Sequence, residues 1–268
     1  MSVSATPKIS RHRGKAQYFV ERLSESASLD MILIPSGNFL MGSPPEELDR
    51  YDNEGPQHSV SISTFFLGKY AITQAQYEAV MGNNPSHFKD EPDSTNHPVE
   101  KVSWSDAVDF CRRLSERAGK EYRLVSEAEW EYACRARTTS PFHFGETIDA
   151  EIANYSASVT YGRGKEGESR GKTTPVGSLK VANAFGLFDM HGNVWEWCAD
   201  NWHKNYEVVP DNKDWVEGGN KEIHSLRGGS WNNFPRFCRS ACRSYNVADD
   251  RGNSIGFRVA CSARGVAT

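Results

Sequence analysis

Apolar and polar residues alternate in two parts of the chain, residues 58–67 and 254–260, which is the pattern of strands with one buried face. Residues 31–42 read as strand, turn and strand, with Pro35-Ser36-Gly37 as the turn. These segments predict a sheet that residues 254–260 close.

Three helices are predicted by their capping residues. At each start, a Ser or Thr side chain can cap the backbone while the residue three positions later reaches back to it. The middle helix also places Ala107, Phe110, Cys111 and Leu114 on one face. The capping pairs are Thr73 with Gln76 before a stop at Gly82, Ser103 with Asp106 before a stop at Gly119, and Ser126 with Glu129 in a helix that runs through Cys134.

Beyond the third helix the periodic patterns fade. Residues 138–260 are dominated by Gly, Asn, Pro and aromatic residues and show no convincing helix and few long strands. A compact domain of this kind has to be built from packed loops pinned by aromatic side chains. With no internal repeat visible, we expect one domain over residues 29–262. It would follow an N-terminal arm at residues 1–28, with helical turns at 17–23, and precede a tail at 263–268.

The charge balance argues against two classes of partner. The chain has 31 Lys and Arg against 35 Asp and Glu, so we expect no nucleic acid and no membrane as partner. The apolar stretch at residues 31–34 is far too short to span a bilayer, and the N-terminus lacks the apolar run of a secretory signal. Six cysteines in 268 residues do not make a disulfide scaffold, so we expect a cytoplasmic protein.

Six segments, spread in order over residues 31–260, are typical of one protein family. They read IPSGNFLMGS (34–43), PVEKVSW (98–104), RLVSEAEWEYA (123–133), HGNVWEW (191–197), RGGSW (227–231) and GFR (256–258). Together they resemble the formylglycine-generating enzymes, also called sulfatase-modifying factors. The resemblance implies an α+β, C-type-lectin-like fold with little regular secondary structure and three helices in the first half.

The resemblance also implies a catalytic pair of cysteines, which this chain has only in part. Family enzymes oxidise a sulfatase cysteine with molecular oxygen and a copper(I) ion held by two thiolates. Counted from the RGGS motif, the cysteines should fall at positions 233 and 238, where this sequence has Asn233 and Cys238. A neutral amide is a poor ligand for soft Cu(I), so we expect neither copper nor this oxidation. Ser230 matches the family's active-site serine, and Cys242 is a candidate replacement thiol that keeps an oxygen-dependent enzyme open as the alternative.

Residues 232–254 contain no Lys, Glu, Gln, Met or Trp. These five amino acids cannot arise when the adenines of an Asn codon are randomised and its third base is kept. The segment therefore resembles the variable region of a diversity-generating retroelement protein, of a bacterial and in particular cyanobacterial type. Arg236, Cys238, Arg239, Arg243 and Arg251 would be framework residues. The expected ligand-binding residues are Trp231, Asn232, Asn233, Phe234, Phe237, Cys242, Ser244, Tyr245, Asn246, Val247, Asp250, Gly252, Asn253 and Ser254.

The composition of this segment is that of a binding loop. Phe234, Phe237 and Tyr245 lie among small polar residues, and aromatic anchors in such surroundings are typical of binding surfaces. The sequence therefore predicts a non-catalytic protein that binds a protein or peptide ligand. The alternative is an invariant scaffold domain in which an ordinary loop packs its aromatic rings inward.

A calcium site is implied by the same resemblance. Asn193 and Glu196 match a segment that holds calcium in the family, and the carbonyls of Gly192 and Val194 would add oxygen ligands. The alternative is a Glu196 carboxylate bonded to backbone or to Arg within a buried Trp pair. A second calcium site of the family is matched only in part, around Asn154.

Overall fold

The computed structural model describes residues 13–207 and 219–263, so parts of the expected arm and tail, residues 1–12 and 264–268, lie outside the described residues. Within them, the helices are α1 (Gln74–Met81), α2 (Trp104–Ala118) and α3 (Glu127–Arg135), and the 3-10 turns are η1 (Asp52–Glu54), η2 (Ser94–Asn96) and η3 (Pro235–Cys238). The strands are β1 (Tyr18–Arg22), β2 (Ser28–Ile34), β3 (Gly37–Met41), β4 (His58–Ile62), β5 (Phe65–Gly68), β6 (Tyr122–Leu124), β7 (Trp195–Trp202), β8 (Asn220–Arg227), β9 (Arg243–Val247), β10 (Ile255–Phe257) and β11 (Val259–Ser262).

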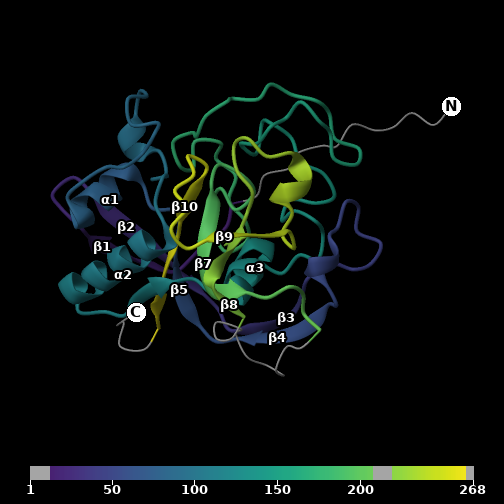
Figure 1. The fold of residues 1–268 in the computed structure, drawn as a ribbon, viewed down its shortest axis with the longest axis horizontal. Helices are drawn as coiled ribbons and strands as arrows, with labels where there is room; N and C mark the ends of the chain where they lie inside the picture. Colours follow the sequence, from purple (N-terminus) through teal and green to yellow (C-terminus); the bar gives the residue numbers. More distant parts are fainter. Residues whose placement is uncertain (1–12, 208–218, 264–268) are drawn as a thin grey trace.

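The strands form three sheets (Figure 1). The largest has the order β1-β2-β5-β11-β6, with every neighbouring pair antiparallel. The second has the order β10-β7-β8-β9, in which β10 runs parallel to β7, and β3 pairs with β4 alone. The predicted closing strand is confirmed in two parts, because β10 joins the second sheet and β11 joins the first. This segment therefore ties the two sheets together.

All three predicted helices are confirmed, with their capping boxes. Thr73, Ser103 and Ser126 each accept a hydrogen bond from the backbone N–H three residues later. Gly82 and Gly119 end the first two helices in the left-handed region, which glycine adopts without strain. None of the described helices is long and apolar enough to cross a membrane.

The two faces of the largest sheet pack in two different hydrophobic cores. Met31 and Phe66 pack in one core with Phe110 of α2. Ile32, the next residue along β2, packs in the other core with Trp130 of α3. The helices are divided in the same way: Figure 1 shows α1 and α2 together on one side of the molecule, whereas α3 lies close to β7 and β8.

Two features of the strands differ from the prediction. Residues 17–23 do not form helical turns, because every residue of β1 pairs with β2. The sheet therefore begins at Tyr18, inside the segment expected to be an arm. The sequence also misses β7 and β8, which have eight residues each. The first four residues of β7 are all buried, so this strand carries no alternating pattern to detect.

The long connection between α3 and β7 is a packed loop, as expected. The described chain has no helix or named strand between Arg135 and Trp195. Phe142, Tyr155 and Tyr161 fill a small core of their own there. The result is a rigid scaffold whose second half has little regular structure.

Candidate ligand-binding surface

The chain leaves the second sheet at the end of β8. Residues 231–254 then lead back to this sheet, first as β9 and then at the start of β10. Gly229, with φ 72°, makes the turn into the segment, where a Cβ atom would lie 2.6 Å from the Cys238 sulfur. The chain then forms η3, pairs as β9 with β8, and turns into β10. The indole N–H of Trp231 donates to the Asn253 carbonyl at 3.2 Å, which joins the two ends of the segment.

Most of the expected ligand-binding residues reach the solvent. Phe234, Tyr245 and Val247 are 44%, 51% and 52% exposed, and Tyr245 and Val247 lie two residues apart on β9, so their side chains are on the same face of the strand. Asn232 is exposed as well. The partly exposed candidates are Trp231, Asn233, Phe237, Ser244, Asn246, Asp250, Gly252, Asn253 and Ser254.

Cys242 requires a correction. Its side chain is fully buried and packs in the same core as Met31 and Phe110. It stands between Arg239 and Arg243, whose side chains are buried too. Cys242 therefore belongs to the framework, and a ligand on this surface does not contact it.

Arg239 fixes η3 to the first half of the chain. Its Nη1 donates to Glu47 at 2.6 Å and to Glu54 at 2.8 Å, and its Nη2 donates to Glu54 at 2.6 Å. Backbone carbonyls of Arg236 and Asp49 accept the remaining bonds, at 3.0 and 2.9 Å. The guanidinium and both carboxylates are buried, and buried charges are tolerated only when they are paired in this way.

Arg243 anchors β9 by the same means. Its Nε and Nη2 donate to the two carboxylate oxygens of Glu127 at 2.6 and 3.0 Å, and its Nη1 donates to the Asn53 carbonyl at 2.7 Å. Burial alone would raise the pKa of Glu127, but Arg243 and Arg227 reverse the effect and hold that pKa below its usual value. The middle of the segment, from the end of η3 to the start of β9, is thus held by buried ion pairs.

Two aromatic residues from elsewhere in the chain complete the surface. Trp202 of β7 lies against Tyr245, with ring centroids 4.6 Å apart. Tyr51 stacks on Phe237, with centroids 5.9 Å apart. Trp202 and Tyr51 lie outside residues 232–254, so the composition of that segment did not indicate that they belong to the surface.

The positions that match the family's catalytic centre do not form a thiolate site. The Ser230 hydroxyl is buried and lies within hydrogen-bonding distance of the Oδ1 atoms of Asn232 and Asn233. Burial raises the pKa of the Cys238 thiol, and raises that of Cys242 to about 12. In the family copper(I) is held by two thiolates, and the neutral amide of Asn233, which stands at the first of these positions, does not fit this soft ion.

The Glu196 carboxylate, expected to bind calcium, is bonded to protein groups instead. Arg258 donates to its oxygens from Nε at 3.1 and 3.2 Å and from Nη2 at 2.9 Å. Trp130 donates to Oε2 at 2.7 Å, and the Gly192 carbonyl accepts from the Val194 N–H at 3.1 Å. The arrangement matches the alternative reading of Glu196 and does not fit a calcium ion at Gly192, Asn193, Val194 and Glu196.

An arginine also holds the loop around Asn154. Arg170 donates from Nη2 to the Ala150 carbonyl at 2.6 Å and from Nη1 to the Ala153 carbonyl at 3.2 Å. The Asn154 amide donates to Asn193 at 3.1 Å. In each of the two regions that the resemblance related to calcium, an arginine is therefore bonded to oxygen atoms: Arg258 to the Glu196 carboxylate and Arg170 to the Ala150 and Ala153 carbonyls.

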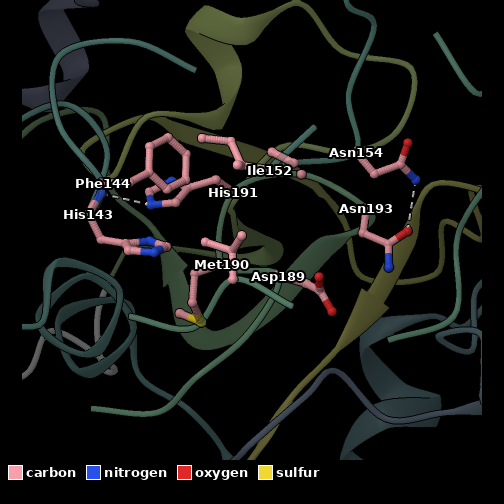
Figure 2. A pocket seen from close by; sticks show the side chains of 11 residues that line it. His143, Phe144, Ile152, Asn154, Asp189, Met190, His191 and Asn193 are labelled. Carbon is pink, nitrogen blue, oxygen red and sulfur yellow. Dashed lines mark hydrogen bonds between the residues drawn. The ribbon is translucent and has the colours of Figure 1, made fainter. Parts of the chain in front are cut away.

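A small pocket lies next to this loop (Figure 2). Figure 2 shows His143 and His191 at one end of it and Asn154 and Asn193 at the other. His191 donates from Nδ1 to the Cys238 carbonyl at 2.7 Å and accepts at Nε2 from the His143 N–H at 3.1 Å. Burial lowers the pKa of His191 to about 4, so the ring stays neutral and helps to position η3.

Comparison with known proteins identifies the family. The family model of the sulfatase-modifying factor enzyme 1-like domain matches residues 18–263. The chain belongs to this family. The formylglycine-generating enzyme of Mus musculus is 30% identical over an alignment 291 positions long, gaps included. The alignment covers 86% of this chain and 74% of that protein. The matched region starts at the first residue of β1, in agreement with the pairing of β1 in the sheet.

Two solved structures share the architecture of this family member. PvdO from Pseudomonas aeruginosa has a TM-score of 0.78 at 32% identity, over 94% of this chain and 100% of that chain. Treponema denticola variable protein 1 has a TM-score of 0.80 at 27% identity, over 91% and 99%. The expected α+β, C-type-lectin-like fold of the formylglycine-generating-enzyme type is confirmed, and so is the resemblance to a variable protein.

Proposed function

We propose that this protein is a non-catalytic binding protein whose ligand, a protein or peptide, contacts residues 231–254, and that a retroelement diversifies this segment. The division of the segment into two sets of side chains carries the proposal. Of the five expected framework residues, Cys238, Arg239 and Arg243 are buried, whereas Arg236 and Arg251 are exposed. The expected variable residues other than Cys242 are all exposed or partly exposed. Changes in the second set leave the buried ion pairs intact.

The exposed set has the chemistry of a binding surface. Aromatic side chains supply large contact areas at low entropic cost, and they dominate the energy of many interfaces. Phe234 and Tyr245 are 44% and 51% exposed, on a segment held by buried ion pairs. A loop that packed its rings inward would bury both side chains, so the exposure of Phe234 and Tyr245 favours binding over an invariant scaffold.

Asn233 favours a protein without the family oxidation. This neutral amide stands at the first of the two family cysteine positions, and it is a poor ligand for soft Cu(I). The six cysteines are free and buried, which fits the reducing cytoplasm that we propose as the location.

Selection from two displayed libraries tests the proposal. The first library randomises Asn232, Phe234, Tyr245 and Val247, and the second randomises four exposed positions of comparable size elsewhere, Leu40, Leu48, Arg112 and Glu116. Each library is selected against the same two unrelated purified proteins. We expect specific binders from the first library in preference to the second. Equal yields, or none from the first library while its members remain folded, would overturn the proposal.

A further inference from the structure

Arg236 lies in η3, within residues 231–254, and its guanidinium lies against two aromatic rings. The Cζ atom is 4.9 Å from the ring centroid of Phe237 and 5.7 Å from that of Tyr51. These two rings are themselves stacked at an interplanar angle of 28°. Arg236 is exposed, so stacking orders the side chain without removing its polar edge from solvent.

The residues that hold this guanidinium in place are linked to one buried carboxylate, that of Glu54. Glu54 accepts both bonds from Arg239 described above, and Arg239 Nε donates to the backbone carbonyl of Arg236 at 3.0 Å. Glu54 also accepts a hydrogen bond from the Tyr51 N–H at 3.1 Å. Glu54 therefore holds the Tyr51 backbone directly and the Arg236 backbone through Arg239, and a ligand that contacts Arg236 causes less loss of conformational entropy than it would with a freely moving side chain.

Arg236 also lacks an anionic partner in the described part of the chain. Across residues 13–207 and 219–263, no hydrogen bond or ion pair to its guanidinium is formed. Arg251, the other exposed framework arginine, differs because it is paired with Asp106 at 3.0 Å. A planar guanidinium with its donors free is suited to two parallel hydrogen bonds to a carboxylate.

We infer that the ligand of this surface presents an Asp or Glu side chain to Arg236, next to an apolar side chain that contacts Phe234 and Phe237. The inference rests on the proposed function and names the partner's chemistry. An acidic side chain of the ligand would complement the positive charge of Arg236. An apolar side chain next to it would cover the ring of Phe234, which is 44% exposed. As a framework position, Arg236 would supply the same carboxylate anchor to each variant of the segment, while the variable residues choose among acidic partners.

The test is selection of random peptides, displayed on phage without a free carboxyl terminus, against the whole protein. The wild type is compared with Arg236→Gln and with the matched control Arg251→Gln. We expect an enriched Asp or Glu beside an apolar residue for the wild type and for Arg251→Gln, and no such enrichment for Arg236→Gln. A selected peptide should bind Arg236→Gln about tenfold more weakly, as its own Glu→Gln version does to the wild type.

Two other outcomes separate this inference from the proposed function. Peptides whose binding is lost in Phe234→Ser but which lack acidic residues, or which bind Arg236→Gln as well as the wild type, would overturn the carboxylate anchor and leave the binding surface standing. Peptides that bind Phe234→Ser and Tyr245→Ser as well as the wild type would contradict the proposed surface itself. Unchanged melting temperatures of all variants exclude unfolding as the cause.

Discussion

We expect the buried ion pairs of Arg239 with Glu47 and Glu54 to hold residues 231–254 on the scaffold and to contribute strongly to stability. Arg239→Met keeps much of the side-chain volume and removes the charge. It leaves the carboxylates of Glu47 and Glu54 buried without their shared partner. Removing one member of a buried pair costs about 3–5 kcal/mol, because the remaining charge is uncompensated.

For a domain of this size, each kcal/mol corresponds to about 2–4 °C in melting temperature, so we expect a loss of roughly 10 °C. The loss should shrink as the pH falls, because burial already raises the pKa of Glu47, and this carboxyl, once unpaired, takes up a proton in the folded state before it does in the unfolded chain. Differential scanning calorimetry at several pH values measures both effects. Glu47→Gln, which weakens one contact only, provides a milder variant if Arg239→Met does not fold.

Arg251→Met is the matched control. Arg251 lies in the same segment and pairs with Asp106, but the two side chains are 51% and 30% exposed. Exposed pairs contribute about 0–1 kcal/mol, so this variant should melt within a few degrees of the wild type. Equal losses for Arg239→Met and Arg251→Met would refute the claim that buried pairs fix the segment.

Three further predictions concern the surface, a buried acid and the thiols. Phe234→Ser should change the free energy of unfolding in urea by less than about 1 kcal/mol because the side chain is 44% exposed and lies outside the buried core, and a larger loss would mean that the ring supports the core. Glu100→Gln should raise the melting temperature more at pH 8 than at pH 5. Burial raises the pKa of Glu100 to about 7, so the wild type loses stability as pH rises from the unfolded pKa through that value; equal gains at both pH values would contradict this. Copper(I) titration of the reduced protein should show no stoichiometric binding that Cys238→Ser abolishes, and such binding would revive the oxidase alternative.

Local signals predicted the helices and the outline of the segment. A capping box acts within four residues, so Thr73, Ser103 and Ser126 could be identified without knowledge of the fold. The missing amino acids in residues 232–254 are likewise visible in the sequence alone. These features needed no long-range contact to be recognised.

Burial and distant contacts could not be predicted in the same way. Codon arithmetic states which amino acids a position allows, but not which way the side chain points, and Cys242 was therefore placed on the surface. Tyr51 and Trp202 join the surface only because the fold brings them there. The role of Glu196 depended on Arg258, 62 positions away in the sequence, and that separation hides the ion pair from any local pattern.

The most direct test of the central claim is the nucleotide sequence of the locus in its source genome. Diversification predicts a near-identical repeat of the region that encodes residues 232–254, beside a reverse-transcriptase gene. The repeat should differ from the coding copy at adenines, and the affected codons should include those of Asn232, Phe234, Tyr245 and Val247 but spare Arg239 and Arg243. A locus with no such repeat, or with differences spread evenly over exposed and buried codons, would contradict the account.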